Sequence, residues 1–310
     1  MSAALLVDTD PGVDDALAIL MAHALGDVAG LCIAAGNVGL AHTVGNALKL
    51  VEVLGADTPV FAGCVGPLVQ PALDAAFVHG ADGFGDSGYL PARRAAADEH
   101  AAAAIVRLAR ERPGELTLVA LAPLTNLALA LRLDPELPSR IARLVVMGGA
   151  VNGHGNLPQL PMTEFNIGFD PEAAHVVFSG WPLFDLVDWE LCMRHAIAFD
   201  RYDALVEAAS GPARLYRAIS RKARAFNQAH ARGGMVTADA LAMAMALDAG
   251  LATHCEMRHV RIEREGHLTR GTTVVDRDGR LGQAPNARIV MDVDQARFEA
   301  MVAAALRVPG

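Results

Sequence analysis

The chain of 310 residues is poor in cysteine and in aromatic residues, with four cysteines and 5% Phe, Trp and Tyr. It contains no Cys-x-x-Cys pair and no Cys/His pair at zinc spacing, which argues against a disulfide framework or a structural zinc site. The N-terminal residues lack a basic region, and no apolar stretch reaches membrane-spanning length. We therefore expect a cytoplasmic protein with reduced thiols at Cys32, Cys64, Cys192 and Cys255.

Positive charge is also scarce, because 26 Lys and Arg face 35 Asp and Glu, for a formal net charge of -9. With no basic block to reverse this balance, we expect neither nucleic acid nor a membrane as a partner. Apolar residues are plentiful at 53%, which is enough for a sizeable core. The chain has no repeat and no Pro/Ser-rich linker, so a single domain over residues 1–310 is the simplest interpretation.

Short apolar runs alternate with longer Ala/Leu-rich segments along the chain. This alternation predicts an α/β fold with a mostly parallel open sheet flanked by helices, and Gly-separated runs over His259–Asp276 predict a late β-hairpin. The expected strands are Ala4–Asp8, Leu31–Ala35, Leu116–Leu121, Arg143–Met147, Pro182–Val187 and Arg288–Val293. The expected helices are Asp14–Leu25, Leu40–Leu54, Glu99–Glu111, Leu124–Leu131, Glu172–Phe178, Pro212–Ala229, Asp239–Leu247 and Gln295–Leu306.

The most informative stretch is an acidic turn at the end of the first expected strand. Asp8 and Asp10 precede Pro11-Gly12, and Asp14 and Asp15 open the following helix. Carboxylates near a helix N-terminus interact favourably with the helix dipole, which explains the second pair but not the first. Carboxylate oxygens are ligands for hard cations, so the turn indicates a site for Ca²⁺ or Mg²⁺.

Two other interpretations of the turn have features against them. An EF-hand would need its glycine elsewhere and a Glu closing a twelve-residue loop. The Asp-x-Asp turn of haloacid-dehalogenase-like Mg²⁺ phosphatases matches Asp8-Thr9-Asp10 superficially, but Pro11 and the Asp14-Asp15 pair do not belong to that pattern. The phosphatase stays open as a distant alternative.

The whole turn, Asp-Thr-Asp-Pro-Gly-x-Asp-Asp-Ala, resembles that of the inosine-uridine-preferring nucleoside hydrolase family. Further segments follow in the family's order over most of the chain, and it is their joint order that is specific. These segments are Ala35–Asn37, Val78–Gly80, Ala122–Asn126, Val146–Gly149, Thr163–Ile167, Asp170–Ala174 and Leu268–Gly271. The resemblance implies hydrolysis of the N-glycosidic bond of a ribonucleoside or another N-riboside, and a homodimer or homotetramer.

The resemblance also implies a Ca²⁺ site. Asp10 and Asp15 match the two N-terminal metal ligands, and Asp239 matches the last carboxylate. Leu121 occupies the position whose backbone carbonyl binds the ion, where the family usually has Thr. A water and two substrate hydroxyls would complete a shell of the size that Ca²⁺ prefers. In this scheme the metal lowers the pKa of the water, and Asp10 accepts its proton.

Substrate contacts carry over in the same way. Asp14 and Asn166 hold the ribose hydroxyls, whereas Glu164 and Asn156 reach the 5′ end. Asn37 and Met147 line the ribose pocket, and Phe165 in the Thr163–Ile167 segment is a further expected substrate contact. His79, in a Gly-rich loop, is expected near the base.

The sequence departs from the family pattern just before Asp239. Many relatives carry a His there that protonates the leaving base, and another subgroup carries a Trp, but this chain has Ala238. We expect His230 to replace the missing acid, with Phe226 one turn earlier packing on the base, and His154 and His79 as weaker candidates. Because of Ala238, a non-catalytic or atypical N-riboside-binding protein remains an alternative.

Overall fold

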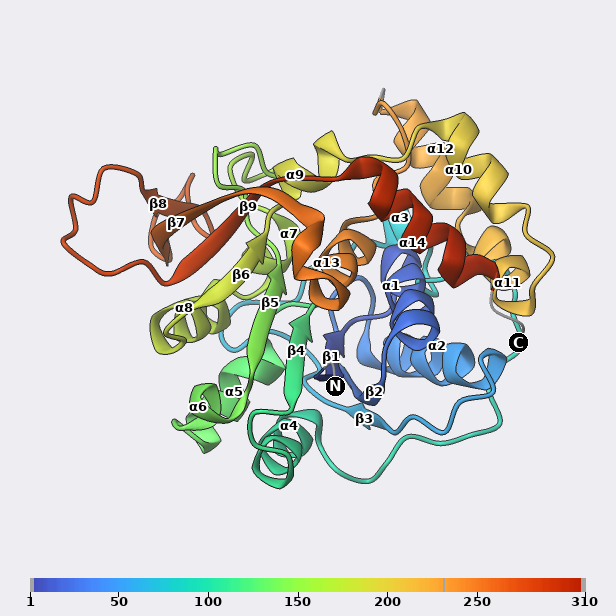
Figure 1. Cartoon of the computed structure of the whole chain (residues 1–310), viewed down its shortest axis with the longest axis horizontal. Helices are drawn as coiled ribbons and strands as arrows, with labels where there is room; N and C mark the ends of the chain where they lie inside the picture. Colours follow the sequence, from blue (N-terminus) through green and yellow to red (C-terminus); the bar gives the residue numbers. More distant parts are fainter. Residues whose placement is uncertain (1–2, 231, 308–310) are drawn as a thin grey trace.

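The computed structural model describes residues 3–230 and 232–307 of the chain. At its centre is a nine-stranded sheet with the order β3-β2-β1-β4-β5-β6-β9-β7-β8 (Figure 1). Pairing is parallel from β3 to β9, whereas β7 runs antiparallel to β9 and β8 antiparallel to β7. The strands are Ala4–Thr9 (β1), Val28–Ile33 (β2), Val60–Ala62 (β3), Leu116–Ala120 (β4), Arg143–Met147 (β5), Phe184–Val187 (β6), Ala252–Ile262 (β7), Thr273–Asp276 (β8) and Ala287–Val293 (β9).

Helices cover both faces of the parallel part of the sheet. α1, α2, α13 and α14 pack on one face, and α4, α5 and α8 pack on the other (Figure 1). A strand covered on both faces has no solvent side, which explains why all six residues of β1 are apolar or buried. The helices are Val13–Leu25 (α1), Leu40–Val53 (α2), Ala76–His79 (α3), Ala101–Glu111 (α4), Thr125–Leu133 (α5), Leu137–Arg140 (α6), Phe165–Phe169 (α7), Pro171–Gly180 (α8), Trp189–Arg194 (α9), Phe199–Val206 (α10), Gly211–Ile219 (α11), Arg221–Ala229 (α12), Ala238–Leu247 (α13), the 3₁₀ turn Ala249–Leu251 (η1) and Gln295–Arg307 (α14).

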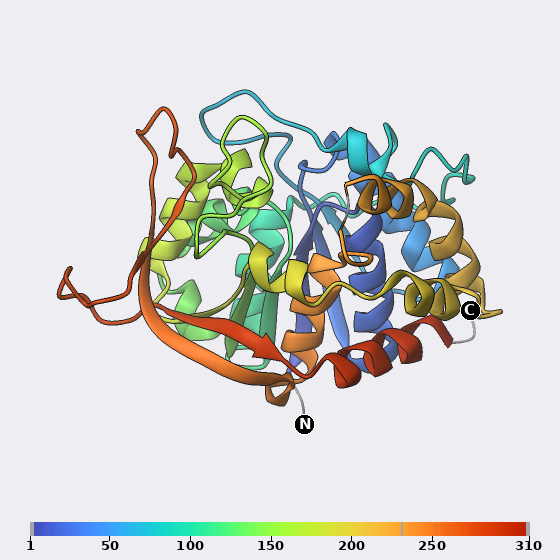
Figure 2. The same ribbon diagram turned by 90° about the horizontal axis from the view of Figure 1, so that it is seen from above.

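The loops that follow the strands gather at one edge of the molecule. Seen from above, the loops after β3 and β5 lie along this edge with α3 and α12, whereas α14 and the N-terminus lie along the opposite edge (Figure 2). In an open parallel sheet, ligands bind beyond the carboxyl ends of the strands. The first edge is therefore where a functional site is expected.

The predicted α/β class and the mostly parallel sheet are confirmed, and the late hairpin is present at one sheet edge as β7 and β8. The hairpin begins earlier than expected, because β7 starts at Ala252 and also pairs with β9. The single helix predicted over Pro212–Ala229 is wrong, since Ser220 separates α11 from α12. At this break Gly85 approaches the Ile219 carbonyl so closely that a Cβ on Gly85 would overlap it.

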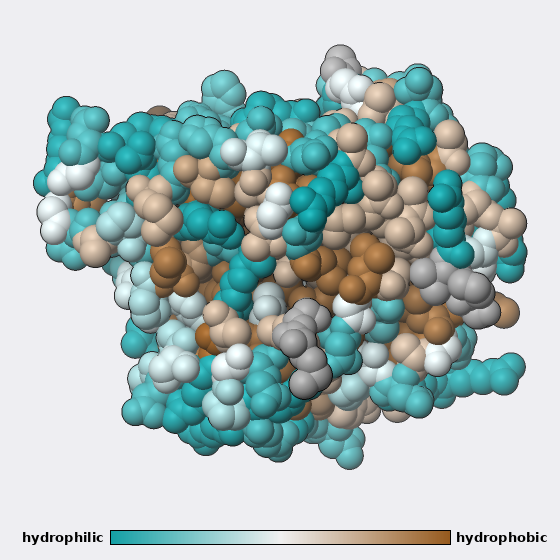
Figure 3. Space-filling view, in the orientation of Figure 1, coloured by the Kyte–Doolittle hydropathy of each residue, from teal (hydrophilic) through white to brown (hydrophobic). Residues whose placement is uncertain are grey.

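Polar residues cover most of the periphery of the molecule in the view of Figure 3, and apolar residues gather toward the middle of that face, over α1 and α13. Among the described residues, no helix combines the length and the apolar character needed to span a lipid bilayer.

Candidate active site

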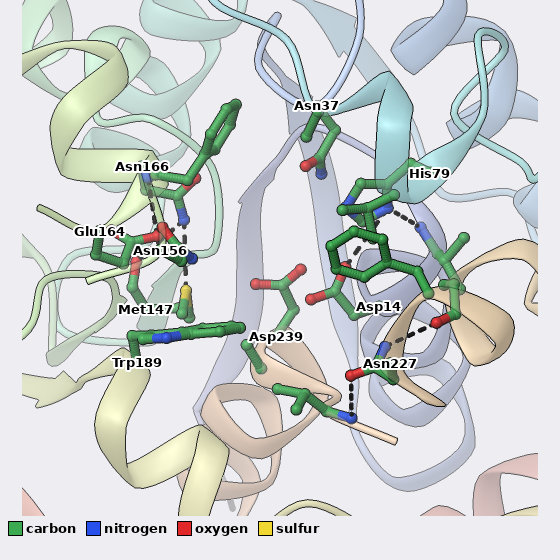
Figure 4. A pocket seen from close by; sticks show the side chains of 18 of the residues that line it. Asp14, Asn37, His79, Met147, Asn156, Glu164, Asn166, Trp189, Asn227 and Asp239 are labelled. Atoms are coloured by element: carbon green, nitrogen blue, oxygen red, sulfur yellow. Dashed lines mark hydrogen bonds and ion pairs between the residues drawn. The ribbon is translucent and has the colours of Figure 1, made fainter. Parts of the chain in front are cut away.

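A pocket opens at the carboxyl ends of the central strands, between the loops after β1, β2 and β5 and the first turn of α13. Figure 4 shows Asp14 and Asp239 in its middle, with Glu164, Asn156, Asn166 and Met147 on one side and His79 on the other. The pocket is lined by Val13, Asp14, Asn37, Ala75, Phe77, Val78, His79, Leu121, Met147, Asn156, Leu157, Glu164, Phe165, Asn166, Trp189, Ala223, Phe226, Asn227, Arg232, Met235, Val236, Ala238 and Asp239.

Asp15 is buried beneath the pocket and is fixed by four hydrogen bonds, the longest of them from the Asp10 amide at 3.3 Å and the other three shorter. Its carboxylate accepts those three from Thr9 Oγ1 at 2.5 Å, from the Gly12 amide at 3.0 Å and from Asn37 Nδ2 at 3.0 Å. β1 ends at Thr9 and α1 begins at Val13, so the turn folds back on itself to bring these donors together. The Asp15 side chain also caps the N-terminus of α1 through the Gly12 amide, so the helix itself explains one of the four carboxylates of the turn.

Asp10 lies beside it and is equally buried. Its Oδ2 accepts the Asn37 amide hydrogen at 2.6 Å, and Asn37 Nδ2 donates to the Asp10 carbonyl at 3.1 Å. A Cβ on Gly36 would overlap Asp10 Oδ2, so this close approach needs a glycine. Burial raises the pKa of the Asp10 carboxyl well above its ordinary value, and the charge of Asp15 raises it further.

Three carboxylates converge in a way that can hold a metal ion. One oxygen from each of Asp14, Asp15 and Asp239 lies within 4.8 Å of the other two. Burial raises the pKa of the Asp239 carboxyl well above its ordinary value, and the charges of Asp14 and Asp15 add to this effect. We call Asp10, Asp14, Asp15 and Asp239 the acid cluster. Asp14, which we expected to bind ribose, is one of the three converging carboxylates, whereas Asp10, which we expected to bind the metal, is not among those three.

No arginine or lysine compensates the acid cluster among the ion pairs within residues 3–230 and 232–307. His79 Nδ1 lies 4.0 Å from Asp14, but burial lowers the pKa of His79 to about 4, so its ring is neutral at neutral pH. Burying several carboxylates is costly unless a cation accompanies them. An oxygen-only donor set without protein cations fits a hard divalent metal ion. The Leu121 carbonyl lies at the same pocket and accepts a hydrogen bond from Asn166 Nδ2 at 2.7 Å.

Glu164 anchors the side of the pocket opposite His79. It precedes α7, and its carboxylate accepts hydrogen bonds from the amides of Asn166 at 2.8 Å, Gly149 at 2.9 Å and Ile167 at 3.1 Å. Burial nevertheless raises the pKa of Glu164 to about 7. Asn156 faces the same pocket, and its buried Oδ1 has no hydrogen-bond partner. That oxygen is available to a donor on a ligand.

His79 is held in one tautomer by the acidic turn. The Val13 amide donates to His79 Nδ1 at 3.0 Å, so the proton of the neutral imidazole resides on Nε2. His79 therefore offers the pocket a hydrogen-bond donor.

All of the sequence-predicted substrate residues line this pocket, whereas His230 does not. α12 ends at Ala229, and the exposed His230 ring turns back so that its centre lies 3.9 Å from that of Phe226 and its Nδ1 2.9 Å from the Phe226 carbonyl. His230 therefore does not line the pocket in this structure, and its role as a proton donor stays a prediction. His154 is also exposed and outside the pocket. Ala238 is buried and does line the pocket, so the space of the usual acid is present without its side chain.

Sequence reasoning missed two prominent residues of the pocket, Trp189 and Arg232. Trp189 opens α9 directly after β6, so the rule that ligands bind beyond strand ends could have located it. Arg232 follows α12 and belongs to no motif. Its position beside the other pocket residues in the folded structure identifies it, because nothing in the neighbouring sequence does.

Comparison with known proteins agrees with this geometry. A model of the family described as inosine-uridine preferring nucleoside hydrolase matches residues 5–300. The chain is 37% identical over 302 residues to the non-specific ribonucleoside hydrolase RihC of Klebsiella pneumoniae, covering 96% of each protein. Its structure is similar to that of an inosine-guanosine nucleoside hydrolase (TM-score 0.93, 31% identity, 100% of each chain). It is also similar to a purine-preferring ribonucleoside hydrolase from Gardnerella vaginalis (TM-score 0.89, 28% identity, 98% of each chain).

Proposed function

The chain belongs to the inosine-uridine preferring nucleoside hydrolase family, and on that premise we propose that it is a Ca²⁺-dependent ribonucleoside hydrolase in which Asp10 accepts the proton of the attacking water. The observation that carries the proposal is the convergence of Asp14, Asp15 and Asp239 at the pocket that Glu164 and Asn166 also line. This combination supplies ligands for a hard cation beside polar groups for a sugar.

Asp15 and Asp239 would hold the ion together with Asp10 and the Leu121 carbonyl, with Asp14 close enough to join them. When bound, Ca²⁺ would lower the pKa of a water and draw the ribose hydroxyls into place. The acid cluster supports this assignment because oxygen atoms of Asp14, Asp15 and Asp239 converge and, among the described residues, no arginine or lysine forms an ion pair with them. Calcium content measured on the purified protein tests the assignment, and zinc held by Cys or His would contradict it.

Asp10 suits the role of proton acceptor. The Asn37 amide engages its Oδ2 and orients the carboxylate. An ionised carboxylate held in this orientation can accept a proton from a water bound beside it.

The remaining polar groups would position the sugar. Asp14 and Asn166 would hold its 2′ and 3′ hydroxyls, while Glu164 and the unpartnered Asn156 Oδ1 would bind the 5′ hydroxyl. Cleavage of an N-glycosidic bond builds positive charge on the sugar ring, as in other glycoside hydrolyses. The negative acid cluster would stabilise that charge.

Turnover of purine and pyrimidine ribosides with added Ca²⁺ is the experiment that tests the function. We expect release of ribose and free base. Ala238 supports one second candidate, a riboside-binding protein without turnover, which would show binding of ribosides and no release of ribose. Phosphate release from phosphomonoesters, with no base release, would contradict both.

A further inference from the structure

Arg232 places a positive charge inside the pocket. Its guanidinium carbon lies 5.0 Å from the ring centre of Trp189 and 5.3 Å from that of Phe226, and all three side chains line the pocket. Arg232 Nη1 donates to the buried Asn227 Oδ1 at 3.2 Å, and Asn227 Nδ2 in turn donates to the Ala223 carbonyl at 2.8 Å. We call Trp189, Phe226 and the arginine between them the aromatic frame. Stacking and the Asn227 contact fix the orientation of the planar guanidinium.

This guanidinium is free to bind an acceptor on a ligand. No salt bridge to a carboxylate involves Arg232 among the described residues, whereas Arg224 on α12 and Arg143 on β5 are each paired with an aspartate. Burial opposes its charge, and the negative charge of Asp14 partly offsets that effect, as the direction of its pKa shift reflects. A half-buried arginine keeps its charge and carries only hydrogen-bond donors. It therefore favours a ligand that presents oxygen or nitrogen acceptors and accumulates negative charge.

We propose that Arg232 binds the O6/N7 edge of a departing 6-oxopurine, so that the enzyme prefers inosine and guanosine to adenosine; the inference rests on the proposed function. The two adjacent acceptors O6 and N7 match the fork of a guanidinium. Adenine offers N7 beside an amino donor, which a guanidinium cannot accept. Uracil presents a single oxygen on the corresponding edge beside a C–H group. The rings of Trp189 and Phe226 supply apolar surface for the purine.

The step that Arg232 assists is departure of the base. The C1′–N9 bond breaks, its electron pair remains on the purine, and the water oxygen forms the new bond to C1′. The water proton passes to Asp10, and the purine anion gains a proton from solvent after release. In the purine anion the charge is shared with O6 and N7, which Arg232 contacts. Stabilising this anion replaces the protonation that Ala238 cannot provide.

Steady-state kinetics with inosine, guanosine, adenosine and 4-nitrophenyl riboside test the assignment. We expect the unaltered enzyme to favour inosine over adenosine by about 10- to 100-fold in kcat/KM, the range expected for one good bidentate contact. Arg232→Met should lower kcat/KM for inosine and guanosine by about that factor, and should affect adenosine far less. It should barely slow 4-nitrophenyl riboside, whose leaving group is a stable anion without help. Arg232→Lys should give an intermediate loss, because lysine keeps the charge and loses the fork.

Arg224, which lies on α12 shortly before Arg232 in the sequence, provides a matched control. It also stacks on an aromatic ring, that of Phe199 at 3.9 Å, but it pairs with Asp203 and does not line the pocket. Arg224→Met should leave the inosine-to-adenosine ratio unchanged. The loss in Arg232→Met should also be constant between pH 6 and pH 9, because a guanidinium does not titrate there. A proton donor would instead give a loss that shrinks as the pH rises.

The outcomes distinguish failure of the proposed function from failure of the role assigned to Arg232. Absence of hydrolysis of every ribonucleoside by the unaltered enzyme would overturn the proposed function. Hydrolysis without a preference for 6-oxopurines, or equal losses on all four substrates in both Arg232 variants, would overturn the role of Arg232 and leave the hydrolase intact.

Discussion

The acid cluster and the aromatic frame stand side by side in one pocket, yet they are fixed in different ways. Asp10 and Asp15 are held by short, buried hydrogen bonds to backbone amides and to Asn37, at the ends of paired parallel strands. The aromatic frame comes from α9, α12 and the segment after α12, and within the described residues one hydrogen bond, to Asn227, anchors its arginine side chain. In the proposed function, the groups for the metal ion and the sugar would thus be fixed at the strand ends of the sheet, while base recognition would rest on helices packed beside it.

The largest effect should come from removing the sugar's 2′ hydroxyl. If Asp14 and Asn166 hold the diol, a 2′-deoxyriboside leaves buried polar groups without partners, and discrimination can reach about 10⁴-fold. Measuring kcat/KM for inosine and 2′-deoxyinosine checks this. Comparable values for the two substrates would show that Asp14 and Asn166 do not bind the 2′ hydroxyl.

Asp10→Asn should lower kcat by about 10²–10⁴-fold, the usual consequence of removing a general base. The substitution keeps the shape of the side chain and its contact with Asn37. Calcium content should be measured in the same samples to separate loss of the ion from loss of the base. Asp15→Asn is the comparison variant, because we expect its lower activity to follow lower metal occupancy. Near-normal turnover of Asp10→Asn would remove Asp10 from the mechanism.

His230→Ala tests whether a residue next to the aromatic frame, but outside the pocket, contributes to departure of the base. Because His230 lies outside the pocket, we expect its loss to slow inosine hydrolysis by far less than the roughly 10²-fold that removal of a general acid causes. Rates with inosine and 4-nitrophenyl riboside measure the effect. A strong loss confined to inosine would restore His230 as the proton donor and would imply that its ring moves into the pocket.

A further effect, on stability rather than on activity, is expected at Asp8, which is buried in β1. Burial raises its pKa from 3.8 to about 7, against the hydrogen bond from Asn126 at 2.9 Å. Between these values the unfolded chain loses a proton that the folded chain keeps, so this group's contribution to stability falls as the pH rises toward 7.

Asp8→Asn should therefore gain stability over the unaltered protein as the pH rises from about 4 to 7, by about 4 kcal/mol at most, with no further gain at higher pH. Urea unfolding at several pH values, with the metal removed by chelation, measures this difference. Parallel stability curves for the two proteins would show that Asp8 is ionised in the fold. Thr117→Val, at a β4 position paired with β1, is a control because it alters no titratable group.

The parts of the molecule that could be predicted from sequence are those in which the residues of an element or a motif are contiguous along the chain. β1 and α1 are continuous in sequence with the acidic turn, so motif and geometry were found together. β3 was missed because Val60–Ala62 is too short to show a period. The break at Ser220 depends on the loop that carries Gly85, which lies far away in the sequence.

The pocket shows the same limit. Glu164 and Asn166 lie in one contiguous segment, whereas Trp189 and Arg232 meet only after α9 and α12 have packed. His230 was placed by its spacing from Asp239, and although the predicted helix ends at Ala229 as α12 does, spacing cannot reveal which way the side chain turns beyond that end. Side-chain direction beyond a helix end is set by tertiary packing.

Arg232 is followed by Gly233 and Gly234 in the stretch that joins α12 to the acid-bearing α13. A Cβ at Gly233 would meet nothing, whereas one at Gly234 would overlap the Ile197 carbonyl, so the second glycine is fixed and the first is open to change. Directed evolution could therefore vary positions 232 and 233 as a small library and select for growth on different nucleosides. The acid cluster and the residues that hold it would stay unchanged in such an experiment.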